Sequence, residues 1–465
     1  MKHSMPFLAG LKRYLAQKVY PFHTPGHKGG RGILPAFASL LEHALAIDVS
    51  LMNELDDLHG PQNILAEAQA QAAKLYGADK SFFCVNGTSG ALHAMILGAV
   101  RQGEKILLPR NAHRSIAGAL VVSGAQPVYV QPEFDAGFGI ATQVTVQAIA
   151  KQFALHKDIK AVLVTSPSYY GIATDLEQIA QIVHAHEAIL LVDEAHGPHL
   201  GFSDLLPKSA LQSGADACAQ STHKIVGALT QCSLLHVKNG RLDAEKIRHA
   251  FSLLTTTSPN QLFLASLDAA CFQLAGSGKE MAERAVELAS YMREQLAFID
   301  KIQIMDWPEK HFFDRTKVTL NVKKLGLTGY EAADFLRGQM IAVELADAEN
   351  ILFLITYADE KAGIDKAVAA IKKLPAREKV SREKIPGLPE PQAVMTPREA
   401  FFGKTIKKPI LEAKDCIAAE EITFYPPGIP VVLPGELITQ EVLAYCKTYA
   451  DTREKFEEKI INVVQ

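Results

Sequence analysis

The sequence predicts an α/β protein with a mainly parallel sheet, and two observations carry this prediction. Between residues 65 and 237, short apolar runs bounded by Gly, Pro, Asn or Asp alternate with stretches whose apolar residues recur at helical spacing. Repeated strand–helix–strand units require a parallel sheet with helices on both faces. The composition, with 48% hydrophobic and 21% charged residues among 465, is that of a globular protein that can bury a large core.

Six apolar runs are the predicted strands of this sheet. In chain order they are 81–87, 105–111, 127–132, 161–168, 188–197 and 215–224. Stretches such as 176–187 (LEQIAQIVHAHE) are the helices between them. Such sheets display their chemistry at the carboxyl ends of the strands. The polar residues that end these runs are therefore site candidates: Asn86, Arg110, Asn111, Ser166, Asp193 and His223.

Shifts in composition divide the chain into five expected parts. They are an N-terminal segment 1–35, a large domain 36–300, a small α/β domain 301–374, a linker 375–397 and a C-terminal α+β module 398–465. The small domain has a strand–helix–strand–strand pattern. The linker is expected because five prolines stand among many charged residues there, a composition that cannot form a core.

Charge and cysteine content exclude several classes of protein. The 48 basic and 51 acidic residues give a formal net charge of −3, which argues against nucleic acid as a partner. The six cysteines form no C-x-x-C pair, so neither a zinc ribbon nor a disulfide framework is expected. Lys12 and Arg13 interrupt any signal peptide, and no apolar run is long enough to span a membrane. We therefore expect a cytoplasmic protein.

The first predicted strand runs into the turn Gly87-Thr88-Ser89 and then into a helix. A helix N-terminus with free N–H groups and two hydroxyls is a candidate binding site for a phosphate. The alternative is a plain strand-to-helix turn with Thr88 or Ser89 as the N-cap. A serine-hydrolase elbow is disfavoured because its G-x-S-x-G motif needs a glycine where Ala91 stands.

In the run 188–197, five apolar residues precede Asp193, which is therefore expected at the end of a strand. Residues 193–196 also spell the DEAH box of an ATPase, but the required phosphate loop is missing: the only G-K-T follows the box and has Arg398 in place of its first glycine. A metal site built from Asp193, His196 and His199 is a further alternative, yet no second cluster completes it. No metal is therefore expected.

Lys224 is the only formally charged residue between positions 217 and 237. One interpretation is a surface lysine with a buried stem. The other is an amine nucleophile, because apolar surroundings disfavour the ammonium form. Together, the phosphate turn, Asp193 and Lys224 meet the three needs of pyridoxal phosphate, which are an anion seat, a carboxylate for the pyridine nitrogen and a lysine for the aldehyde. His113 ends another strand and is either a ring that stacks on the pyridine or a core histidine.

These residues, with further motifs, resemble the bacterial ornithine/lysine/arginine decarboxylases of pyridoxal-phosphate fold type I (aspartate aminotransferase-like), and especially the Gram-positive type of arginine decarboxylase. The resemblance covers nearly the whole chain. The motifs that carry it are PFHTPGHKGG (21–30), ELDDLH (54–59), NGTSGA (86–91), DEAHG (193–197), STHK (221–224), YPPGIP (425–430) and PGE (434–436).

The resemblance implies a role for each site residue. Lys224 bonds covalently to the cofactor, Asp193 pairs with the pyridine nitrogen and His113 stacks on the ring. Gly87, Thr88, Ser89 and Ser221 hold the phosphate, while His196 and His223 lie beside the ring. His223 and Lys224 are candidate acids for the proton delivered to Cα. Glu436 is a candidate partner for the distal cation of the substrate.

The resemblance also implies decarboxylation of a basic amino acid, with L-arginine giving agmatine and carbon dioxide in polyamine biosynthesis. L-Lysine and L-ornithine are alternative substrates. A catalytically silent partner subunit is the remaining non-enzymatic alternative, against which intact Lys224 and Asp193 argue. An aminotransferase or aldolase is disfavoured because the C-terminal motifs are decarboxylase features. A homodimer with shared active sites is expected, with 23–30 and 255–258 serving the partner's site. The longer members carry a receiver-like domain before the motif at Pro21, so this is expected to be the short form, without a higher assembly.

Overall fold

The computed structural model describes residues 4–41, 43–377, 386–424, 428–449 and 456–465. Its central sheet has seven strands in the order β1-β9-β8-β7-β6-β2-β3. From β8 to β3 all neighbours are parallel, whereas β9 is antiparallel to both β8 and β1. The strands are β1 Lys80–Cys84, β2 Lys105–Pro109, β3 Gln126–Val130, β6 Ile159–Thr165, β7 Ile189–Asp193, β8 Ala217–Gln220 and β9 Ser233–Val237. The predicted α/β class with a mainly parallel sheet is confirmed.

All six predicted runs contain a strand of this sheet, but each strand ends before its run does. The polar tail of 188–197, for example, leaves the sheet after Asp193. The sequence did not predict β9, because its five residues directly continue the apolar stretch that follows Lys224.

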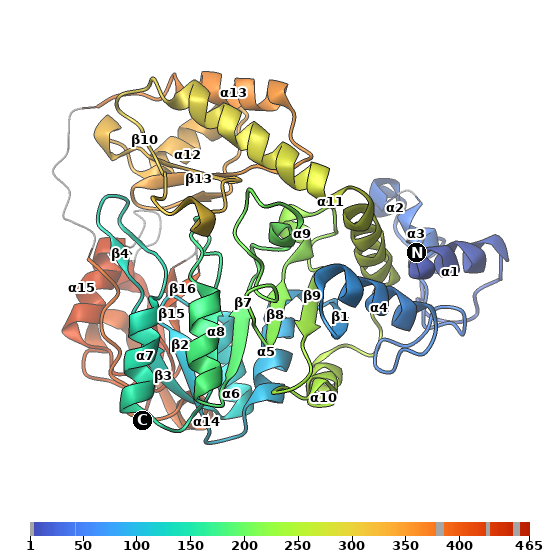
Figure 1. Cartoon of the computed structure of the whole chain (residues 1–465), viewed down its shortest axis with the longest axis horizontal. Helices are drawn as coiled ribbons and strands as arrows, with labels where there is room; N and C mark the ends of the chain where they lie inside the picture. Colours follow the sequence, from blue (N-terminus) through green and yellow to red (C-terminus); the bar gives the residue numbers. More distant parts are fainter. Residues whose placement is uncertain (1–3, 42, 378–385, 425–427, 450–455) are drawn as a thin grey trace.

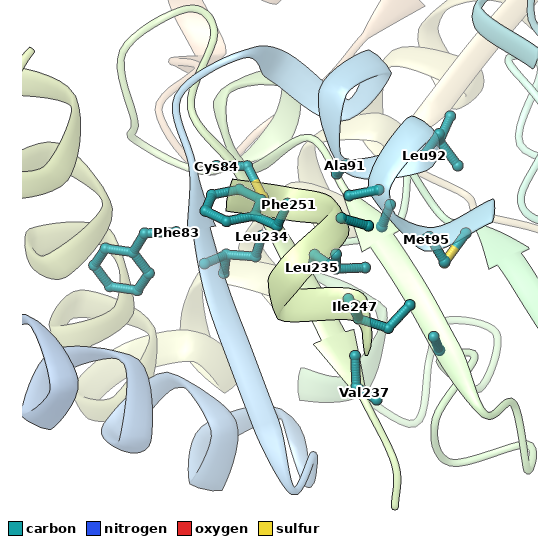
Figure 2. Close-up of a cluster of buried hydrophobic side chains, with 14 of the residues drawn as sticks. Phe83, Cys84, Ala91, Leu92, Met95, Leu234, Leu235, Val237, Ile247 and Phe251 are labelled. Atoms are coloured by element: carbon teal, nitrogen blue, oxygen red, sulfur yellow. The ribbon is translucent and has the colours of Figure 1, made fainter. Parts of the chain in front are cut away.

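Helices cover both faces of the sheet (Figure 1). One face packs against α5 Gly87–Ala99, α6 Ser115–Ser123 and α10 Ala244–Leu254, and the other against α7 Val146–Leu155 and α8 Leu176–Ala185. Figure 2 shows Leu92 and Met95 of α5 beside Ile247 and Phe251 of α10 in this core. The absence of a side chain at Gly98 lets the two helices approach, because a Cβ there would meet Ile247 at 2.5 Å.

The N-terminal helices lie beside α4 Ile64–Tyr76, near the β1 edge of the sheet (Figure 1). They are α1 Pro6–Ala16, α2 Pro35–Leu41 and α3 Ala44–Ile47. Phe7 and Leu11 of α1 are buried in the same core as β1 and α5. Short elements complete this part of the chain: β4 Phe134–Asp135, β5 Ile140–Ala141, η1 Leu200–Phe202 and α9 Thr222–Ile225.

The long helix α11 Gln261–Leu296, kinked at Ser277, leads to a second sheet of order β10-β11-β13-β12 above the carboxyl ends of the parallel strands (Figure 1). Its elements are β10 Gln303–Ile304, η2 Lys310–Phe312, β11 Lys317–Asn321, η3 Lys323–Leu325, α12 Gly329–Gly338, β12 Leu345–Ala346, β13 Asn350–Leu354 and α13 Lys361–Ile371. The predicted strand before Asn350 is reduced to the two residues of β12.

The C-terminal unit lies against α6, at the β3 edge of the large sheet (Figure 1). It consists of α14 Pro397–Phe402, β14 Thr405–Pro409, η4 Ile410–Glu412, β15 Ile422–Phe424, β16 Ile429–Val432, α15 Gln440–Tyr449, η5 Phe456–Glu458 and β17 Ile460–Val464. Residues 378–385 of the expected linker and 425–427 of the YPPGIP motif lie outside the described residues. Among the helices of the described ranges, none has the length and apolar character needed to cross a membrane.

Candidate active site

A cavity of about 330 Å³ lies at the carboxyl ends of the parallel strands. It is bounded by the loops that follow β1, β2, β6, β7 and β8, and by Ile429 of the C-terminal unit. The structure brings ten sequence-predicted residues to its wall: the strand-end candidate Asn111 and the nine residues predicted to hold the cofactor, which are Gly87, Thr88, Ser89, His113, Asp193, His196, Ser221, His223 and Lys224.

One end of the cavity is the N-terminus of α5. Asn86 is the N-cap residue, but its side chain accepts no hydrogen bond from the N–H groups of the helix. Its Nδ2 atom donates instead to the carbonyl oxygen of Leu254. Thr88 and Ser89 lie in the first turn, so the alternative that one of them is the N-cap is wrong. Gly87 has a φ of +67° and open space where a Cβ would point. The uncapped N–H groups of this thirteen-residue helix therefore face an open, anion-compatible position.

Hydroxyl groups gather at the same place. Thr88 Oγ1 lies 2.5 Å from Ser221 Oγ and 2.8 Å from Ser233 Oγ. Thr165 also lines the cavity, and its buried Oγ1 has no hydrogen-bond partner among the described residues. Buried hydroxyls are normally paired, so an unpaired one in a cavity wall suits a bound ligand oxygen.

Asp193 ends β7 and is 3% exposed. Its carboxylate accepts the N–H of Ala195, and no cation of the described residues lies within ion-pair distance of it. Burial raises the pKa of Asp193, whereas the charge of Lys224 opposes this rise. A buried carboxylate in this position is completed by a ligand that brings its own positive charge.

The two histidines beside it are neutral and have defined tautomers. Burial lowers the pKa of His113 to about 4, and its Nδ1 accepts the N–H of Ser115, so its proton is on Nε2. Burial also lowers the pKa of His223, whose Nδ1 donates to the carbonyl oxygen of Cys232. The Nε2 atom of His223 is therefore left as an acceptor.

Lys224 is half-buried on α9, and burial lowers the pKa of its amine although Asp193 opposes this. Its Nζ atom lies 2.9 Å from His196 Nε2 and 5.4 Å from the ring centroid of Tyr169. The interpretation of Lys224 as an ordinary surface lysine does not fit this position. The amine faces a cavity in which burial makes the ammonium form less stable than it is in water.

The sequence did not single out several residues of the cavity wall. They are Leu92, Ala141, Thr165, Pro167, Ser168, Tyr169, Tyr170, Ala195, Thr230, Gln231 and Ile429. Five of these lie in the run 161–168 or directly follow it, and only Ser166 was noted there. The rule that polar residues follow strand ends could have found them. Ile429 belongs to the YPPGIP motif, but its sequence position does not indicate that it reaches this cavity, because it comes from a distant unit of the fold.

Four other candidates do not line the cavity. Asn86 is exposed and Ser166 is buried outside the cavity wall, while Arg110 and Glu436 pair with each other. Glu436 Oε2 accepts from Arg110 Nη2 at 2.8 Å, and both side chains are almost fully buried. The single chain therefore gives no support for Glu436 as the partner of a substrate cation.

The metal alternative also finds no support in the geometry. His199 is oriented toward Asp314, with 3.3 Å between Nε2 and Oδ1, rather than toward Asp193. Within the described ranges, no group of three metal-ligating side chains is arranged to hold an ion.

Comparison with known proteins identifies relatives over nearly the whole chain. Residues 5–319 match the profile of the Orn/Lys/Arg decarboxylase major domain, and residues 380–458 match that of the corresponding C-terminal domain. The chain is 41% identical to the arginine decarboxylase of Bacillus subtilis over 96% of its own length and 93% of the relative's. It is 42% identical to that of Halalkalibacterium halodurans, over 95% and 92%.

A solved structure shares the fold. The lysine decarboxylase LdcF of Francisella novicida superimposes with a TM-score of 0.85 at 23% identity, covering 100% of this chain and 81% of that protein.

Proposed function

Because the chain belongs to the Orn/Lys/Arg decarboxylase family, we propose that it is a pyridoxal-phosphate-dependent carboxy-lyase that converts L-arginine to agmatine and carbon dioxide. The observation that carries this proposal is the convergence of Lys224, Asp193, His113 and the start of α5 on one cavity. Arginine is favoured because two relatives at 41% and 42% identity are named arginine decarboxylases. The described cysteines are all free thiols, which supports a cytoplasmic location.

The residues of the cavity fit this cofactor. The α5 N-terminus, with the hydroxyls of Thr88 and Ser221, would hold the phosphate, and Thr165 has a hydroxyl free for a ligand oxygen. Asp193 would pair with a protonated ring nitrogen, and the flat neutral ring of His113 would stack on the pyridine.

Each of these residues has a distinct task in the reaction. The bound cofactor supplies an electron sink for the bond that breaks at Cα. Asp193 keeps a proton on the ring nitrogen through charge pairing in a buried site. Lys224 would hold the cofactor covalently through its amine. His223 and Lys224 remain the candidates for carrying a proton to Cα because both border the cavity, and His223 would first have to take up a proton on its Nε2 atom.

The test is an assay of carbon dioxide release from arginine, lysine and ornithine by the protein loaded with pyridoxal phosphate. We expect arginine to have the highest kcat/KM. A higher value for lysine or ornithine would reassign the substrate and leave the class of enzyme unchanged. Binding of the cofactor without release from any of the three would contradict the decarboxylase proposal, and failure to bind it would favour a silent subunit.

Replacing Asp193 with asparagine is expected to reduce kcat with arginine about a hundredfold, because a neutral amide cannot hold the proton on the ring nitrogen. Asparagine keeps the shape and the oxygen that accepts the Ala195 N–H. Steady-state kinetics at saturating cofactor measure the loss. An unchanged kcat in D193N would remove Asp193 from the proposed site.

We infer that the active enzyme is a homodimer whose partner completes the substrate site. Among the described residues that line the cavity, Asp193 is the only carboxylate, and the proposal commits it to the cofactor. The distal cation of arginine therefore needs an acid from outside this cavity wall. Between residues 20 and 40, the large apolar side chains of Tyr20, Phe22, Leu34 and Leu40 are exposed, which suits a subunit contact. Sedimentation of the active enzyme is expected to give a dimer, and an active monomer would contradict this inference.

A further inference from the structure

Lys317 is a lysine with no exposed surface, at the start of β11 in the small domain. Its Nζ atom lies 3.9 Å from Asp314 Oδ2 and 3.3 Å from His196 Nδ1. Lysine is almost never fully buried unless it is paired. Lys317 does not line the cavity, so it can influence a ligand there only through another residue.

The residue between Lys317 and the cavity is His196. Its Nε2 atom lies 2.9 Å from Lys224 Nζ, and its Nδ1 atom lies 3.3 Å from Lys317 Nζ. Burial, reinforced by the charges of the two lysines, lowers the pKa of His196 well below its usual range. A neutral imidazole has one N–H and one lone pair, so it can accept from one amine and must donate to the other. The arrangement therefore favours one ammonium and one free amine.

Asp314 decides which of the two amines carries the proton. Burial opposes ionisation of Asp314, but His199, Lys317 and the hydroxyl of Thr316 together hold its pKa below the usual range. Asp314 is therefore a carboxylate, and it forms an ion pair with Lys317. Burial lowers the pKa of Lys317 to about 8, and the ion pair with Asp314 opposes this and favours the ammonium form of Lys317.

We propose that Lys317 is a positioning residue that donates to His196 Nδ1, thereby fixes the proton of His196 on Nε2, and keeps Lys224 as a free amine. This inference rests on the proposed function, in which Lys224 bonds to the aldehyde of pyridoxal phosphate. In that step the lone pair of Nζ attacks the aldehyde carbon, the nitrogen loses its two protons, and the aldehyde oxygen leaves as water. An ammonium has no lone pair and cannot react.

Several other groups face Lys224 and act on its proton. Asp193 and Glu344 favour the ammonium, whereas burial disfavours it. The remaining titratable groups around it are His113, His196, His223 and the phenol of Tyr169. Burial therefore opposes the two carboxylates, and the hydrogen bonds of His196 to both lysines add a cation on the far side of that ring, which acts in the same direction as burial.

The test measures the rate at which the cofactor-free protein forms the covalent adduct with pyridoxal phosphate, as a function of pH. Borohydride reduction and peptide mass spectrometry identify the lysine that is modified. In K317M we expect the pH midpoint of the rate to rise by about one unit and the rate at pH 7 to fall about tenfold, with an unchanged plateau at high pH. Without the cation of Lys317, the ammonium form of Lys224 is less disfavoured, so Lys224 keeps its proton to a higher pH.

Two further variants make the test specific. D314N keeps the shape of the ion pair but removes the charge that holds the proton on Lys317, so its midpoint is expected to rise as well. K323M is the matched control, because Lys323 pairs with Glu349 at the other end of β11, and its midpoint is expected to remain that of the wild type.

Each outcome has one meaning. If the wild type is not modified at Lys224, the proposed function fails. If the wild type is modified there but K317M and D314N keep its midpoint, or lose rate equally at every pH, the role of Lys317 is overturned and the proposed function stands. If K317M does not fold, D314N decides by the same criterion.

Discussion

Replacement of Lys224 by alanine is expected to reduce turnover of arginine at least about 10³-fold and to abolish the covalent adduct with pyridoxal phosphate. Loss of a covalent nucleophile commonly removes most of the rate enhancement that its site provides. Among the described residues that line the cavity, Lys224 is the only lysine, and Lys317 does not reach the cavity wall. Steady-state kinetics and mass spectrometry after borohydride reduction measure the two effects.

A matched control separates this effect from the general loss of a lysine. Lys208 is 63% exposed and pairs with Glu177 on the surface, so K208A is expected to retain wild-type turnover and the adduct. Persistence of the reduced adduct in K224A, or turnover within tenfold of the wild type, would show that another group holds the cofactor.

Replacement of Arg110 by methionine is expected to destabilise the protein by about 3–5 kcal/mol, because it leaves the Glu436 carboxylate buried without its cation. Arg110 Nη2 also donates to the carbonyl oxygen of Val431 at 2.6 Å. The side chains of Arg110 and Glu436 are 1% and 3% exposed, and the two residues join the large domain to the C-terminal unit. Urea unfolding, together with proteolytic release of the C-terminal unit, measures the loss.

The loss in R110M is expected to depend on pH in a defined direction. Burial already raises the pKa of Glu436 while Arg110 opposes the rise, so R110M raises it further. The folded state then holds a proton that the unfolded state releases at lower pH. Stability therefore falls as the pH rises from the unfolded pKa to the folded pKa, and the defect is larger at pH 8 than at pH 5.

The double variant R110M/E436Q tests the charge itself. It removes both charges and is expected to recover most of the loss, since no uncompensated ion remains buried. The exposed pair Lys208–Glu177 serves as the control, and K208M is expected to change stability by less than about 1 kcal/mol. A loss below about 1 kcal/mol in R110M would show that the buried pair does not hold the C-terminal unit in place.

Most of the large sheet and one side of the cavity could be predicted because they depend on local signals. Asp193 follows five apolar residues, and Gly87 begins a helix directly after a strand. Parallel strands bring such ends together whatever their order in the sheet. The nine residues predicted to hold the cofactor therefore meet at one cavity, although they come from four separate loops.

The other side of the site depends on contacts between distant segments. Lys317 approaches His196 across 121 residues of sequence, and Tyr169 donates to Glu344 across 175. As the first residue of a buried strand, Lys317 resembled an ordinary strand-end lysine. Nothing in its sequence neighbours indicates that it is fully enclosed.

The position of Glu436 also depends on a contact between distant segments that its sequence neighbours do not indicate. Its motif suggested a partner for the substrate, but the fold places it against Arg110, 326 residues away in sequence. A buried carboxylate pairs with the cation that lies beside it in the folded protein. The sequence around Glu436 does not indicate that this cation is Arg110.

By itself, the sequence determined the fold class and the positions of Gly87, Asp193 and Lys224 at or after strand ends, because periodicity and strand-end position are properties of short segments. Only the tertiary structure decided that Glu436 is held by Arg110, that β9 completes the sheet, and that His196 connects Lys224 to Lys317. The physical reason is that the protonation state of a buried amine depends on every charge and hydrogen bond that the fold places around it.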